Sequence, residues 1–183
     1  MSTRGFVGFK TNTKNDREGN IFGIYNHYDS YYSHLGLEML MLYEKKSKEE
    51  LKEIFDKIEW LTDSKDDIRT EWDELFNGES KKVPNDASFL NDGLFCEYAY
   101  VYNLETDRLE VYRGFYTEAQ SPELEKYGYE SYDDTLYHTH KVFEVTRELD
   151  WQQVVDMFTN ADLEDFEEDI ENNIYAETIY MSE

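Results

Sequence analysis

The segment LFCEYAYVYNLETDRLEVYRGFY, residues 94–116, constrains the fold of this chain more than any other segment. Leu94–Tyr102 is predicted to be a strand with apolar residues on both faces, as expected for a strand in the middle of a sheet. Leu104–Asp107 indicates a turn, and Arg108–Phe115 is predicted to be a second strand. The segment therefore predicts a strand–turn–strand unit inside a sheet.

Two shorter strands are predicted near the N-terminus, at Gly5–Lys10 and Asn20–His27. The polar segment between them contains Asn and Gly, so a hairpin is the simplest connection. Leu136–Leu149 is predicted to be a further strand. A chain of 183 residues, of which 16% are aromatic, is long enough to bury one sizeable core.

Three helices are predicted between these strands. The first begins in Leu37–Lys45, and the second follows a capping box formed by Ser47 and Glu50. The third begins at Ser64 and Asp67. Apolar residues recur at helical spacing after these starts. The residues predicted to face inward are Leu51, Ile54, Phe55, Ile58, Leu61, Ile68, Trp72, Leu75 and Phe76.

Together with the remaining segments, these elements predict the α+β fold class. Asn77–Asp86 is predicted to be a loop, Asp150 and Gln153 to cap a short helix, and Asp162–Asn173 to be a last helix with an acidic outer surface. The sequence thus predicts a single domain over residues 1–183, in which helices pack on one face of an antiparallel sheet. The part from about 150 to 183 is predicted to be helical and strongly acidic.

Charge is the most unusual property of the composition. The chain has 42 acidic and 18 basic residues, a net charge of −24. From Glu118 onward there are 19 acidic and 3 basic residues, so this segment carries −16 of the −24. After Arg147 there is no Lys or Arg. Such a field repels nucleic acid and anionic membranes and attracts basic partners.

The other compositional signals are typical of a soluble protein of the cytoplasm. The single cysteine, Cys96, excludes an internal disulfide and the usual Cys-based zinc site, and we expect it to be buried and inert. No apolar run approaches the roughly 20 residues that span a bilayer, and the N-terminus has no signal-peptide pattern. No phosphate-binding Gly loop or dinucleotide fingerprint is present, and we expect no cofactor.

The segment IYNHYDSYYSHLG, Ile24–Gly36, concentrates aromatic and polar side chains at a strand-to-helix corner. Asn26, Asp29 and Ser30 are residue types that hydrogen-bond backbone in turns, which favours a structural corner. A catalytic interpretation would make His27 a base oriented by Asp29, with Ser30 or Tyr31 reacting. A third interpretation is a ligand site formed by Arg4, Asn26, His27 and Asp29.

TRGFVGFK and the Tyr-Asn-His-x-Asp-Ser-Tyr stretch resemble the opening of small uncharacterised proteins that recur in bacteriophages, plasmids and bacterial genomes. The resemblance covers roughly the first 36 residues, and Tyr32 stands where those proteins usually have Pro. It implies a mobile-element origin and carries no assigned reaction. The matching residues are Thr3, Arg4, Gly5, Tyr25, Asn26, His27, Asp29, Ser30, Tyr31, Leu35 and Gly36.

His138 and His140 are the only other residues whose spacing suggests a site. On a strand they share one face, which suits two metal ligands, but two half-buried histidines at a sheet rim fit the pattern as well. We therefore assign neither a metal nor a catalytic residue from the sequence.

The carboxylates of residues 162–171 form the densest charged group in the chain. In a helix, six of these seven carboxylates, those from Glu164 to Glu171, would lie within about 15 Å, at a rise of about 1.5 Å per residue. Duplex DNA carries one charge per about 1.7 Å of axis, so the two charge densities are comparable. Tyrosines between carboxylates form a second patch of the kind found at interfaces. The residues expected to bind a partner are Glu164, Asp165, Glu167, Glu168, Asp169 and Glu171, with Tyr129, Tyr132, Asp133 and Asp134.

These observations predict a non-enzymatic inhibitor encoded by a phage or another mobile element. Its partner would be a basic host protein that itself binds nucleic acid, and an anti-CRISPR or anti-restriction factor acting as a DNA mimic is the natural example. Three alternatives remain. The acidic surface can serve solubility alone, the chain can be a small hydrolase or ligand-binding protein with its site at the Asn26/His27/Asp29 corner, or it can be a dimerising scaffold.

Overall fold

A computed structural model of the chain describes most of the first 116 residues and three later segments. The described residues are 3–11, 21–61, 70–79, 82–87, 89, 96–116, 138–148, 150–160 and 179–180. For residues 113–116, 138–143, 160 and 179–180 only the backbone is described.

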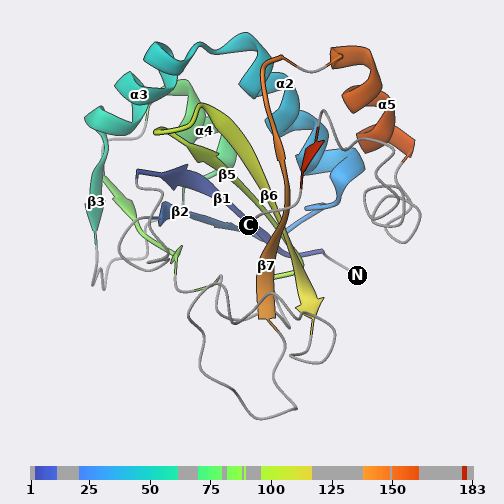
Figure 1. The fold of residues 1–183 in the computed structure, drawn as a ribbon. Coiled ribbons are helices and arrows are strands. Elements are labelled where there is room, and N and C mark those ends of the chain that lie inside the picture. Colours follow the sequence, from blue (N-terminus) through green and yellow to red (C-terminus); the bar gives the residue numbers. More distant parts are fainter. Residues whose placement is uncertain are drawn as a thin grey trace.

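The centre of the fold is a six-stranded sheet with the order β2-β1-β5-β6-β7-β8 (Figure 1). Neighbouring strands pair antiparallel except β1 and β5, which pair parallel, so the sheet is mixed where a wholly antiparallel sheet was predicted. The strands are β1 Gly5–Lys10, β2 Ile21–Asn26, β5 Tyr98–Asn103, β6 Arg108–Tyr116, β7 His138–Val145 and β8 Ile179–Tyr180.

The predicted strand pairs are present. β1 and β2 pair antiparallel over their full lengths, and β5 and β6 flank a turn in which Asp107 has a positive φ of 56°. All six residues of β5 are buried, as predicted for a central strand. The strand is shorter than predicted, because it begins at Tyr98, and Cys96 and Glu97 precede it.

The helices lie on one face of the sheet, so the α+β class is confirmed (Figure 1). The predicted capping box is formed: Glu50 N donates to Ser47 Oγ at 3.2 Å. Gln153 N donates to Asp150 Oδ1 at 3.2 Å, which caps the last described helix as predicted. The helices are α2 Leu37–Lys45, α3 Lys48–Lys57, α4 Trp72–Asn77 and α5 Trp151–Asn160, and a π-helical turn, η1, covers Tyr32–Gly36.

Two predicted elements differ from those in the structure. The second helix was predicted to continue through Leu61, but α3 stops at Lys57 and the chain continues as strand β3, Glu59–Leu61. Trp60 of β3 packs against the rings of Phe9 and Phe22, and this tertiary contact favours the extended backbone over another helical turn. The predicted loop 77–86 likewise contains a strand, β4 Lys82–Pro84, which pairs parallel with β3.

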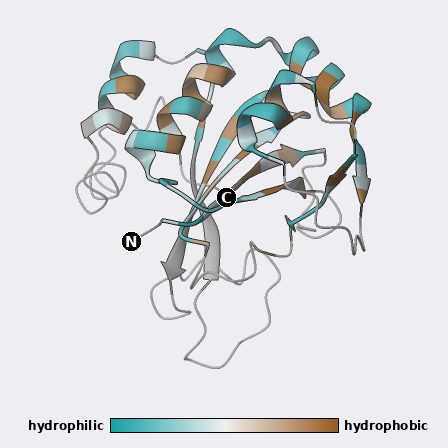
Figure 2. Cartoon of the chain, turned by 180° about the vertical axis from the view of Figure 1, so that it is seen from behind, coloured by the Kyte–Doolittle hydropathy of each residue, from teal (hydrophilic) through white to brown (hydrophobic). Residues whose placement is uncertain are grey.

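Hydrophobic residues fill both sides of the sheet. Val7 and Phe9 of β1 belong to the large core beneath the helices, whereas Phe6 belongs to a smaller cluster with Ala99 and Val101 of β5. Figure 2 shows hydrophobic and hydrophilic residues interspersed along the helices, as expected for helices with one buried face. Among the described residues, no helix has the length and apolar character needed to cross a membrane.

Arg147, which follows β7, joins three separate segments. Its Nε donates to Asp107 Oδ2 at 2.8 Å in the β5–β6 turn. Its two terminal nitrogens donate to the main-chain oxygens of Tyr43 and Lys46 at the end of α2, at 2.7 and 2.8 Å. The guanidinium also lies 4.2 Å from the centre of the Tyr43 ring. These contacts fix the end of α2 against one end of the sheet.

Candidate functional site

The strand-to-helix corner is built around a fully buried Ser30. Ser30 N donates to Thr3 O at 3.1 Å, and Ser30 O accepts from the Tyr100 hydroxyl at 2.8 Å. Asn26 Nδ2 donates to Ser30 Oγ at 2.9 Å. A Cβ at Gly5 would lie 2.6 Å from Ser30, so only glycine fits beside it. These contacts hold the corner together.

The catalytic arrangement of His27, Asp29 and Ser30 is not formed. Asp29 takes a positive φ of 51°, and its main-chain oxygen accepts from Leu35 N at 3.1 Å, so it shapes the turn into η1. Among the described residues no hydrogen bond or ion pair joins His27 to Asp29. The Ser30 hydroxyl is buried, which denies a substrate access to it.

His27 instead pairs with Tyr25. His27 Nδ1 and the Tyr25 hydroxyl oxygen are 2.5 Å apart, a short hydrogen bond on the surface. The ring of Tyr28, which is 68% exposed, stands nearly perpendicular to the imidazole with its centre 4.4 Å away. The end of β2 therefore presents a group of three aromatic rings to solvent.

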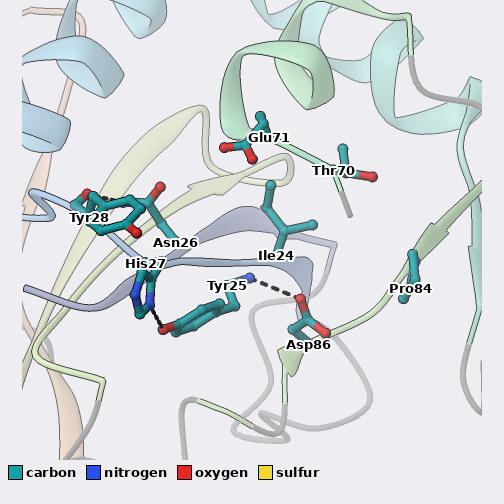
Figure 3. A pocket seen from close by; sticks show the side chains of 9 residues that line it. All are labelled: Ile24, Tyr25, Asn26, His27, Tyr28, Thr70, Glu71, Pro84 and Asp86. Carbon is teal, nitrogen blue, oxygen red and sulfur yellow. Dashed lines mark hydrogen bonds between the residues drawn. The ribbon is translucent and has the colours of Figure 1, made fainter. Parts of the chain in front are cut away.

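A cavity of about 310 Å³ lies beside these rings (Figure 3). Tyr25, Asn26, His27 and Tyr28 line it from the end of β2. Ile24 and Pro84 add apolar surface. The remaining described lining residues are polar or acidic and come from other segments: Thr70 and Glu71 precede α4, and Asp86 follows β4.

Asp86 is held against the outer edge of β2. Its Oδ2 accepts from Tyr25 N at 3.0 Å, and its own N donates to Gly23 O at 2.9 Å. Burial raises the pKa of the Asp86 carboxyl above its ordinary value, and the hydrogen bond from Tyr25 N opposes that rise. No Lys or Arg among the described residues lines the cavity or forms an ion pair with Asp86.

Only two of the four residues predicted from the sequence to form a ligand site line this cavity. Asn26 and His27 line it, whereas Arg4 and Asp29 are not among its described lining residues. The main chain of Arg4 pairs with Glu97, whose Oε2 accepts from Arg4 N at 3.0 Å. Sequence reasoning missed Glu71 and Asp86, which are far from His27 along the chain. The sequence Pro-Asn-Asp at 84–86, whose residue types are common in turns, was the one local signal of a fixed backbone there.

The predicted partner-binding residues lie outside the described part of the chain. This holds for the acidic group at 164–171 and for Tyr129, Tyr132, Asp133 and Asp134. His138 and His140 are in β7, where the backbone alone is described. Within the described residues no group of three His, Cys, Asp or Glu side chains could hold a metal ion. Cys96 is fully buried, as predicted.

Comparisons of the chain with models of protein families, with curated proteins and with solved structures found no match.

Proposed function

We propose that this chain is a non-enzymatic inhibitor that binds a basic, nucleic-acid-binding host protein. The observation that carries the proposal is the charge distribution: residues 118–183 hold −16 of the net −24, and no Lys or Arg follows Arg147. Like charges close together in a helix destabilise it, so such a sequence is costly to the fold alone. A cationic partner surface compensates that cost.

Three basic residues of the described fold form ion pairs within it. Arg108 and Arg147 each pair with a carboxylate at 2.9 and 2.8 Å, and Lys10 pairs with the buried Glu110 at 3.4 Å. These cations hold strands and turns together. The acidic segment after residue 160 has no basic residue of its own with which to form such pairs.

The proposed mode of action is competition with nucleic acid. A row of carboxylates at a spacing near that of duplex phosphates would occupy the positively charged channel of the partner. Association would be fast and would weaken steeply as salt screens the charges. An anti-CRISPR or anti-restriction factor is the proposed class, with the acidic residues of 164–171 as the main contact.

Affinity capture from a nuclease-treated bacterial lysate tests the proposal. The wild-type chain is expected to retain a basic nucleic-acid-binding protein at low salt, to lose it at high salt, and to lose it on adding duplex DNA. A charge-reversed variant with Glu164, Glu167, Glu168 and Glu171 changed to Lys is expected to capture nothing.

A matched variant tests whether the position of the reversed charges matters, or only the net charge of the chain. Glu44, Asp56, Glu59 and Glu105 are exposed residues of the described fold, and changing all four to Lys alters the net charge equally. This control is expected to retain the partner. Equal capture by wild type and the 164–171 variant, or equal loss by both variants, would remove the proposal.

The ligand-binding alternative is favoured by one observation, the cavity beside Tyr25, His27 and Asp86. His27→Ala distinguishes the two functions. The variant is expected to leave capture of a basic protein unchanged, because His27 is distant in sequence from the acidic segment. A function centred on the cavity is expected to be lost.

A further inference from the structure

Three of the described residues that line the cavity offer hydrogen-bond acceptors to a ligand. Asp86 Oδ2 is engaged by Tyr25 N, and its Oδ1 makes no hydrogen bond with another described residue. Asn26 directs its Nδ2 to Tyr28 O and Ser30 Oγ, which leaves its carbonyl oxygen as an acceptor. Glu71 adds an exposed carboxylate from the opposite wall (Figure 3). A ligand that brings N–H donors suits these acceptors.

The charge of the cavity favours a cation. Asp86 and Glu71 are both carboxylates, and no cation of the described residues lines the cavity. Asp86 is partly buried, and a carboxylate removed from water without a positive partner is unfavourable. A bound cation would supply that partner.

The aromatic rings favour a planar cation. Tyr25, His27 and Tyr28 lie together at the end of β2, and the His27 and Tyr28 planes meet at 79°. Aromatic faces attract cations, and a planar guanidinium stacks on them while its N–H groups reach neighbouring acceptors. An ammonium has neither the plane nor the fork of five donors.

The volume of about 310 Å³ lies at the lower end of the range for small-molecule sites. It admits a group the size of one long side chain and is too small for an extended cofactor. The cavity is also open at its Tyr28 side, since that ring is 68% exposed. Entry of a side chain presented by a peptide is therefore possible.

We propose that the cavity formed by Tyr25, His27, Tyr28, Glu71 and Asp86 binds a guanidinium group, from an arginine side chain or from a free arginine derivative. Asp86 Oδ1 and the Glu71 carboxylate accept its N–H groups, and the aromatic rings cover its plane. The inference rests on the ligand-binding alternative and involves no residue of the acidic segment. Its failure would leave the capture of a basic protein untouched.

Titration of the ¹⁵N-labelled full chain tests the proposal. N-acetyl-arginine amide is expected to shift the amide signals of Tyr25, Asn26 and His27 in a saturable way. The citrulline analogue has the same shape without the charge and is expected to bind about tenfold more weakly, in line with the loss of charge-assisted hydrogen bonds. The lysine analogue is expected to bind more weakly than the arginine compound.

Two variants connect the shifts to the carboxylates. Glu71→Gln removes a charge from an exposed residue, and Asp86→Asn removes the other while keeping an oxygen for Tyr25 N. Each is expected to weaken binding of the arginine compound about tenfold. Glu44→Gln, an exposed residue on α2, is the matched control and is expected to bind as wild type does. The spectra themselves report whether each variant is folded.

A peptide with one internal arginine identifies the source of the group. Binding by the peptide as well as the amide indicates a side chain within a protein, and binding by the amide alone indicates a small molecule; both support the guanidinium site. Equal binding of the citrulline analogue, unchanged binding in both Glu71→Gln and Asp86→Asn, or the absence of saturable shifts would each overturn it.

Discussion

Arg147 and Asp107 form an ion pair in which the Nε–H is shared by both carboxylate oxygens, with Nε 3.0 Å from Oδ1 and 2.8 Å from Oδ2. The same Asp107 accepts from the Tyr102 hydroxyl at 2.5 Å, and its main-chain oxygen accepts from the Tyr43 hydroxyl at 2.7 Å. Burial raises the pKa of both tyrosines above the ordinary value of 10, so both remain neutral donors under physiological conditions. The turn between β5 and β6 is thus tied to the helical layer.

Replacing Arg147 by Ala is expected to lower the free energy of unfolding by about 2–3 kcal/mol, because several charge-assisted hydrogen bonds are lost together. The side chain is only 30% exposed, so water replaces these contacts incompletely. Arg147→Lys keeps the positive charge but lacks the planar set of N–H donors. It is expected to lower the free energy of unfolding by more than half as much as Arg147→Ala does. Urea denaturation measures both.

Lys57→Ala is the control for that experiment. The Lys57–Glu53 pair at 2.9 Å has both side chains about two-thirds exposed, and such pairs contribute about 0.5 kcal/mol or less. An Arg147→Ala cost no larger than the Lys57→Ala cost would show that Arg147 does not hold these segments together.

Gly5→Ala is expected to be strongly destabilising. The added Cβ would lie 2.6 Å from Ser30 Cβ and 2.7 Å from the main-chain oxygen of Tyr98. Overpacking of this kind typically costs about 1–3 kcal/mol. Thermal unfolding followed by circular dichroism measures it. Adding Ser30→Gly is expected to restore part of the loss, because the Tyr98 oxygen still obstructs the new methyl group. A stable single variant would contradict the packing described for the corner.

The polar cluster at Glu110 gives a third prediction. Glu110 is 1% exposed and accepts from Asn103 at 2.9 Å and from the Tyr112 hydroxyl at 2.7 Å, with Lys10 Nζ at 3.4 Å. Lys10→Met removes the cation from a buried carboxylate and is expected to cost about 3 kcal/mol. The double variant with Glu110→Gln is expected to cost less than the sum of the two single changes. Additive costs in a urea double-mutant cycle would mean that the two residues are not coupled.

Asp86 should alter the pH dependence of stability. Its pKa is raised in the folded state, so its contribution is most favourable below the ordinary value of 3.8 and is lost as the pH rises through the folded pKa. Asp86→Asn cannot ionise, so it does not lose stability as the pH rises, and its amide oxygen still accepts from Tyr25 N. Relative to wild type, the variant is expected to gain stability between pH 3 and pH 7, by less than about 1 kcal/mol. Parallel stability profiles from urea denaturation would contradict this.

Local signals predicted much of the fold. The Ser47–Glu50 capping box and the burial of Tyr98–Asn103 on both faces depend on residues close together in sequence. The parallel pairing of β1 with β5 was not predicted, because it joins residues more than 90 positions apart and leaves no local pattern. The β3–β4 pair joins residues 23 positions apart and was missed because it too leaves no local pattern. Trp60 shows a tertiary contact overriding helical periodicity.

The candidate site was predicted only where it lies on one segment. Asn26 and His27 belong to a conspicuous stretch, so the sequence indicated them. Asp86 reaches Tyr25 across 61 positions, and Glu71 comes from the start of a short helix. Neither residue stands out among 42 acidic residues. Only the folded chain shows which carboxylates line the cavity together with the aromatic rings.

The hydrogen bonds along the outer edge of β2 have a consequence for solubility. Asn85 Nδ2 donates to Ile21 O and Asn85 Oδ1 accepts from Gly23 N, while Asp86 contacts Gly23 O and Tyr25 N. These two residues occupy the positions that a neighbouring strand would take, and they therefore block the pairing of a second molecule with the edge of β2. Asp86 thus both lines the cavity and covers the outer edge of β2, so a substitution at this position alters both features.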